Sequence, residues 1–138
     1  MTTTDILDIA KDVTAALATL DNNLPTLHSV CFYGDAVTLS PIVSYRPWFK
    51  LVPLLDWADA FGARIEISLS YISSGEVTAR FELGGRNARI TESINTAHAY
   101  ELGAELGLPL TKDKPITITA DTLRAIINAR IGDKTATS

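Results

Sequence analysis

Two pairs of carboxylates have a spacing that suits acid–base catalysis or cation binding. Asp56 and Asp59 lie three residues apart in one helical pattern, and Glu101 and Glu105 lie four apart in another. Residues at these separations share one face of a helix, so each pair presents two carboxylates together. The same pattern is typical of a solvated helix face. Because no further ligand or base accompanies either pair, we favour the solvated-face interpretation.

His28 and Cys31, with His98 as a third member, have the residue types of a metal or nucleophile site. His28 and Cys31 lie three apart in a β-prone run, so their side chains point to opposite faces of a strand. Nothing nearby supplies a base for a catalytic thiolate. The pattern therefore favours a buried cysteine and a surface or edge histidine, with no metal and no cofactor.

The chain's densest aromatic stretch, Tyr45 to Phe49, has the composition of a binding surface. Tyr, Trp and Arg dominate interface hot spots, and Pro47 stiffens the segment that presents them. We therefore predict a recognition loop that exposes Tyr45, Arg46, Trp48 and Phe49. The alternative is that Trp48 and Phe49 fold inward and cap the core.

The run Gly84-Gly85-Arg86-Asn87-Ala88-Arg89 resembles a phosphate cradle in composition. Phosphate-binding glycine loops lie between a strand and a helix, whereas both flanks here have strand patterns. The run is therefore predicted to be a hairpin turn. Arg86 remains a candidate for contact with a partner.

The charge balance argues against nucleic-acid binding, because the net charge is −4 and no segment carries a large cationic surplus. The run from Ala104 to Pro109 is similar to the turn of a helix-turn-helix motif. The next helical pattern begins about a dozen residues too late for a recognition helix. A DNA-associated regulator that uses the C-terminal helices is retained as an alternative.

Strict alternation from Arg64 to Leu83 predicts the elements that position these residues. Ile65, Ile67, Leu69 and Tyr71 alternate with polar residues, and the pattern resumes after Ser73-Ser74-Gly75 through Val77, Ala79, Phe81 and Leu83. This period of two indicates a hairpin with one buried and one solvated face. Ala88 to Ile94 adds a third strand to this meander.

Around the meander, the sequence predicts helices and a second hairpin. An amphipathic helix begins at Thr4, with Ile6, Ile9 and Val13 on its apolar stripe. Strands His28 to Tyr33 and Ala36 to Val43 flank a turn at Gly34-Asp35. Further helices begin near Pro53, at Thr96 and after Thr119. The predicted fold is α+β, in the order α-ββ-α-βββ-α-α, with an antiparallel sheet covered by about four helices.

Length and composition set the outer limits. With 138 residues, of which 46% are hydrophobic, we expect one domain over residues 1–138, with a loose tail at 135–138. No apolar run approaches the ~20 residues of a membrane helix, and the N-terminus lacks a basic signal region. One cysteine permits no internal disulfide, which favours the cytoplasm.

Three segments resemble small uncharacterised α+β proteins of actinobacteria and their phages. They are Leu55-Asp56-Trp57-Ala58-Asp59-Ala60-Phe61-Gly62-Ala63, the following Arg64-Ile65-Glu66-Ile67, and Glu76-Val77-Thr78-Ala79-Arg80-Phe81. The resemblance covers about a third of the chain. It implies no activity and no functional residue.

The resulting hypothesis is a non-enzymatic cytoplasmic module that binds another protein, as a regulatory or phage-encoded accessory factor. Pairing through the two edges of the meander would make a homodimer. Besides the DNA-associated regulator, a second alternative remains. This is a small-molecule-binding or hydrolytic domain with its site between the second helix and the sheet, which would require a polar pocket holding Asp56 or Asp59 beside an arginine.

Overall fold

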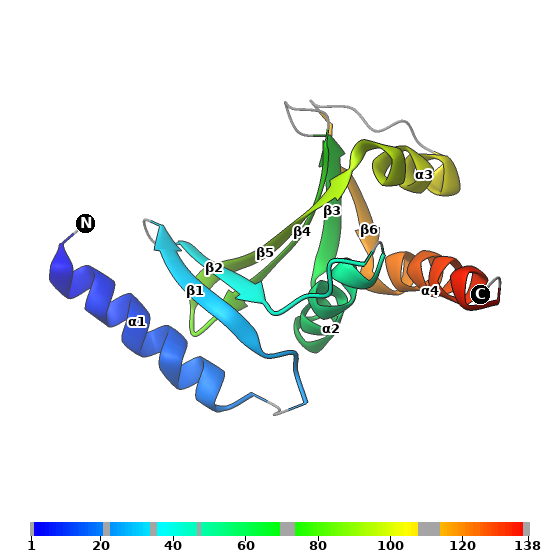
Figure 1. Ribbon diagram of the computed structural model, residues 1–138. Helices are drawn as coiled ribbons and strands as arrows, with labels where there is room; N and C mark the ends of the chain where they lie inside the picture. Colours follow the sequence, from blue (N-terminus) through cyan, green and yellow to red (C-terminus); the bar gives the residue numbers. More distant parts are fainter. Residues whose placement is uncertain are drawn as a thin grey trace.

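The computed structural model of the protein describes residues 2–20, 23–33, 36–46, 48–69, 74–107 and 114–136. In these residues four α-helices and a short 3₁₀ helix accompany one six-stranded sheet (Figure 1). The elements are α1 (Thr3–Ala18), β1 (Leu27–Tyr33), β2 (Ala36–Pro41), η1 (Phe49–Leu51), α2 (Val52–Phe61), β3 (Arg64–Leu69), β4 (Ser74–Leu83), β5 (Arg86–Asn95), α3 (Thr96–Leu106), β6 (Ile116–Thr119) and α4 (Ala120–Ala136). The α+β class is confirmed.

The strands lie in the order β1-β2-β5-β4-β3-β6. The predicted hairpin β1–β2 and the meander β3–β4–β5 are both antiparallel. Two features correct the expected sheet. First, β2 pairs with β5 in parallel, so the sheet is mixed. Second, β6 pairs with β3. Strands of the same chain thus lie along both edges of the meander, with β6 beside residues 64–67 of β3 and β2 beside Ala88 and Arg89 of β5. Pairing with another chain was expected only for uncovered edges, and dimerisation stays a prediction.

One face of the sheet is apolar and carries the helices. Ile65, Ile67, Val77 and Ala79 are fully buried, while Arg80 on the opposite face is exposed. Cross-strand partners share a face, so the apolar residues of all six strands line the same side. The opposite face is polar and has no helix over it within the described residues, and we call it the open face.

Two inward-facing residues are less buried than expected. Phe81 and Leu69 are half-buried and pack at the margin of the core. The Phe81 ring stacks on Phe61 of α2, with 4.3 Å between the ring centroids. Glu66, expected to face solvent, is half-buried, and its carboxylate contacts Arg80. The face assignment holds along the hairpin except at Thr78, which lies on the polar face but is only 8% exposed.

Helix α1 starts one residue earlier than predicted, because Thr2 caps it. The Thr2 hydroxyl accepts a hydrogen bond from the Asp5 backbone N–H, and the Asp5 carboxylate accepts one from the Thr2 N–H. Ile9 and Val13 are buried, but Ile6 is 43% exposed, which corrects its expected place on the buried stripe. A hydrogen-bonded pair between Asp12 and Arg86 ties α1 to the β4–β5 turn.

The remaining helices begin close to the predicted residues. Pro53 lies in the first turn of α2, which ends at Gly62 in a left-handed conformation (φ 62°). The Thr119 hydroxyl accepts a hydrogen bond from the Thr122 N–H at the start of α4. Helix α4 extends to Ala136, so it includes residues 135 and 136 of the expected tail. Residues 137–138, the Gly34-Asp35 turn and Tyr71 lie outside the described residues.

Within the described residues, none of the helices combines the length and apolar character needed to cross a membrane.

Candidate functional site: a cationic pocket at the aromatic loop

A small pocket lies where the aromatic segment meets the end of β5 and the start of α3. Its volume is about 170 Å³. We call it the loop pocket. Its lining residues are Tyr45, Arg46, Trp48, Lys50, Ser93, Ile94, Asn95 and His98. The structure thus brings three of the predicted interface residues together with β5 and α3, about 50 residues away along the chain.

Trp48 forms a buried wall of the loop pocket. Its side chain is only 5% exposed, and its ring lies 4.6 Å from that of His98 between centroids. This corrects the expectation that Trp48 is presented to solvent, and it favours the alternative in which Trp48 closes the core. The Trp48 backbone has φ 70° and ψ −38°, a conformation that costs a non-glycine residue free energy. Tertiary packing therefore holds the residue in place.

The other three aromatic-segment residues differ in exposure. Tyr45 is 88% exposed. Arg46 is also exposed, and its guanidinium carbon lies 4.6 Å from the centroid of the Phe49 ring. Phe49 is half-buried and does not line the pocket, so its part is to support Arg46 through this cation–π contact. An interface role for these residues remains a prediction.

The lining of the loop pocket is cationic. It carries Arg46, Lys50 and His98, and none of its described residues is an aspartate or glutamate. Asn95 caps α3 by accepting a hydrogen bond from the His98 N–H at 2.8 Å, and the first turn of α3 has no acidic residue. The positive end of the helix dipole therefore adds to the charge of Arg46 and Lys50, and the imidazole of His98 adds a polar ring. This arrangement favours a small anion.

A carboxylate behind the pocket partly balances this charge. Glu92 lies on the helix side of β5, 3.9 Å from the Lys50 ammonium, and its side chain is 13% exposed. Burial raises the pKa of Glu92, and the nearby Lys50 offsets part of that rise. Lys50 is thus held toward the sheet by a long ion pair, which leaves Arg46 as the most exposed cation at the pocket.

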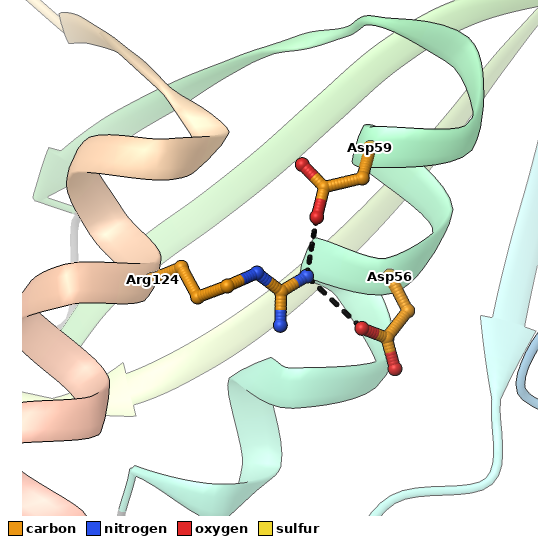
Figure 2. A network of polar contacts seen from close by, with 3 residues as sticks. All are labelled: Asp56, Asp59 and Arg124. Atoms are coloured by element: carbon orange, nitrogen blue, oxygen red, sulfur yellow. Dashed lines mark hydrogen bonds and ion pairs between the residues drawn. The ribbon is translucent and has the colours of Figure 1, made fainter.

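The predicted carboxylate pair on α2 binds an arginine of α4. Asp56 and Asp59 both accept hydrogen bonds from the same Nη2 of Arg124, at 3.0 Å and 2.6 Å (Figure 2). Burial lowers the pKa of Arg124, but the hydrogen bonds to Asp59 and Asp56 outweigh it and raise the pKa overall. The pair therefore links two helices.

The second carboxylate pair has the same relationship to α4. Arg130 lies 2.7 Å from Glu105 and 3.7 Å from Glu101, both on α3. Arg124 and Arg130 lie six positions apart on α4. Arg124 links this helix to α2, and Arg130 links it to α3. Both described arginines of α4 are thus engaged within the chain, which weakens the DNA-binding alternative for this helix.

The remaining predicted chemical residues are dispersed. Cys31 is exposed, which corrects the expected buried cysteine, and His28 is exposed on the edge strand β1 as predicted. Among the described residues, no three His, Cys, Asp or Glu side chains gather to hold a metal ion. Arg86 forms an ion pair with Asp12 at 3.0 Å, so its described contact is within the chain.

Sequence reasoning missed a second hollow, on the open face. It measures about 480 Å³ and includes Arg80 and Arg89, which lie directly opposite each other on β4 and β5. Nε of Arg80 contacts Glu66 at 3.4 Å, and Nε of Arg89 donates to Thr38 at 3.2 Å. The lining holds these two arginines and Glu82, and both arginines already have partners within the chain, so the hollow points to no particular ligand. The alternation placed Arg80 outward, but its position opposite Arg89 required the register.

No known family model, curated protein or solved structure matches this chain.

Proposed function

We propose that the protein is a non-enzymatic binding module that recognises an acidic residue of a partner protein in the loop pocket. The observation that carries the proposal is the lining itself. In a chain of net charge −4, Arg46, Lys50 and His98 converge on one pocket whose described lining contains no acidic residue. Such a site favours a carboxylate, which can accept charge-assisted hydrogen bonds from both Arg46 and Lys50.

The size of the pocket favours one side chain as its occupant. Sites for small molecules and cofactors usually measure about 300–1,000 Å³. The loop pocket, at about 170 Å³, is smaller than that range. A glutamate or aspartate side chain requires less room, and the rest of its peptide would lie across the neighbouring surface.

The surroundings of the pocket favour a protein partner. Tyr45, which is 88% exposed, offers a large aromatic surface beside the cations. Tyr and Arg are enriched among the residues that contribute most to protein–protein affinity. Trp48 is already fixed by its contacts with His98 and Arg130, so binding would cost little ordering of the pocket wall.

Selection from a random peptide library tests this proposal without a known partner. Peptides would be selected in parallel against the unaltered protein, Arg46→Ser and Arg64→Ser. Arg64 is exposed and outside the loop pocket, so its variant controls for the loss of one positive charge. We expect one Asp or Glu position to be enriched with the unaltered protein and Arg64→Ser, and to be lost with Arg46→Ser. A consensus without an acid, or the same consensus with Arg46→Ser, would refute the proposal.

One observation favours small-molecule binding as a second candidate function. A hollow of about 340 Å³ at the end of α2 contains Asp59, Arg64 and Asp121. It meets the size range of ligand sites, although Asp59 is already bound by Arg124. Screening a fragment library by NMR against the unaltered protein and Asp121→Asn would test it. Fragments that perturb the amides of Gly62 and Ala63 only when Asp121 is present would support this candidate.

A further inference from the structure

Strand β1 forms an unprotected edge of the sheet. Among the described residues it pairs only with β2, and its sequence Leu27-His28-Ser29-Val30-Cys31-Phe32-Tyr33 contains no Asp, Glu, Lys, Arg or Pro. Natural edge strands are usually short, charged, interrupted by proline or bulged. The opposite edge, β6, has only four residues. In β1 the pairing irregularity lies between Leu27 and Ser29, and Val30 to Tyr33 pair regularly with β2.

The side chains of β1 have apolar surface left to bury on both faces of the sheet. Val30 and Phe32 face the helix side and are only half-buried. On the open face, Cys31 is exposed and Tyr33 is 81% exposed. A strand added beside β1 would cover part of this surface while satisfying the free backbone groups of the edge.

We propose that β1 pairs antiparallel with β1 of a second copy about a two-fold axis, joining two six-stranded sheets. An uncharged strand is complementary to itself, because no like charges face each other across the pair. Full overlap of the seven residues places Val30 opposite its own copy and Ser29 opposite Cys31. Residues of the same parity then face each other, so the apolar and open faces both continue across the joint.

The proposed register places the two Cys31 residues at diagonal positions on the open face. Diagonal neighbours across an antiparallel pair lie about 7–8 Å apart, which a short bismaleimide can span. Cys31 is the single cysteine of the chain, so the unaltered protein is already a suitable probe. A double variant, Cys31→Ser with Thr117→Cys, moves the thiol to the exposed open face of β6 and serves as the matched control.

Sedimentation equilibrium and cross-linking test the proposal together. We expect a concentration-dependent species of twice the 14.9 kDa chain mass and efficient cross-linking through Cys31 but not through Thr117→Cys. Cys31→Lys would bring like charges together and should weaken dimerisation at least about tenfold, while Thr117→Lys should not. Circular dichroism would confirm that both lysine variants fold. A monomer at all concentrations, or a dimer insensitive to both Cys31 tests, would overturn the proposal.

Discussion

The guanidinium of Arg130 lies over the indole ring of Trp48, with 5.8 Å between the guanidinium carbon and the ring centroid. The same guanidinium binds Glu105 and Glu101 of α3, so it is held in place from the other side. His98 contacts the same indole ring. Trp48 is therefore packed among groups from α3 and α4, and this contact network joins the aromatic segment to the helical layer.

Replacing Trp48 with alanine should destabilise the protein. The side chain is 5% exposed, and deleting a buried tryptophan typically costs about 3–5 kcal/mol in the free energy of unfolding. Tyr45→Ala should change it by no more than about 0.5 kcal/mol, because Tyr45 is 88% exposed. Denaturant titration of the two variants would compare them directly. Equal stabilities would mean that Trp48 is not part of the core.

Glycine is required at Gly84 both by its positive φ and by its close approach to α1. Gly85 shares only the positive φ, so comparing the two positions separates the two effects. Both Gly84 (φ 61°) and Gly85 (φ 77°) have positive φ, so alanine at either position is strained. A Cβ at Gly84 would also lie 2.6 Å from the Asp12 carbonyl oxygen of α1, whereas a Cβ at Gly85 would meet nothing within 4 Å. Gly84→Ala should therefore lose more stability than Gly85→Ala. The backbone amides of α1 should exchange hydrogen faster in Gly84→Ala than in Gly85→Ala. Equal exchange of the α1 amides in the two variants would contradict the close contact between Gly84 and Asp12.

Glu92 should make stability depend on pH in a defined direction. Burial raises its folded-state pKa above the usual 4.5, despite the opposing effect of Lys50. The folded state thus holds the proton more tightly than the unfolded chain. The contribution of Glu92 to the free energy of unfolding is therefore fully present below its unfolded-state pKa. It is lost as the pH rises through the higher folded-state pKa.

Glu92→Gln should remove this pH-dependent loss. The free energy of unfolding of the variant, relative to the unaltered protein, should therefore rise as the pH increases above the usual glutamate pKa of 4.5. Other carboxylates titrate in both proteins and cancel in the difference. Urea titrations at several pH values would measure it. A difference that falls with pH would show that the Lys50 ion pair outweighs burial.

The contacts of Arg124 should show coupling between Asp56 and Asp59. Each aspartate alone keeps Arg124 bound, and both side chains are about 40% exposed, so Asp56→Asn or Asp59→Asn alone should cost only about 0.5 kcal/mol. Losing both leaves a half-buried guanidinium without an acidic partner, so the double variant should cost more than the sum. A double-mutant cycle by denaturant titration measures this, and simple additivity would show that the two contacts are independent.

Local patterns predicted the elements of this fold, but not the long-range pairings. Alternation identified β3 and β4, and Pro53 lies in the first turn of α2, where that helix was expected to begin. Strand β6 was missed because its four residues follow Pro115 and show too short an alternation. The parallel contact between Val37 and Ala88 joins strands about 50 residues apart, and no local signal encodes it.

The candidate site was predicted only in part, because most of its residues come together through long-range contacts. Composition identified the aromatic segment, but it did not distinguish an exposed from a buried Trp48. Lys50, Ser93, Asn95 and His98 joined the loop pocket only through the packing of β5 and α3. The two acidic pairs were correctly predicted to share helix faces. Their arginine partners, 65 and 25 residues away along the chain, could not be predicted from helical spacing.

The indole N–H resonances of the two tryptophans test the central claim most directly. Trp48 lines the loop pocket, whereas Trp57 donates its Nε1 hydrogen bond to the Pro25 carbonyl at 3.0 Å and does not line the pocket. A blocked peptide with a central glutamate would be titrated into the protein beside its glutamine analogue. We predict that the glutamate peptide shifts the Trp48 resonance and leaves Trp57 unchanged, while the glutamine peptide shifts neither. Equal shifts with both peptides, or no shift of Trp48 up to millimolar peptide, would contradict recognition of an acidic residue at this pocket.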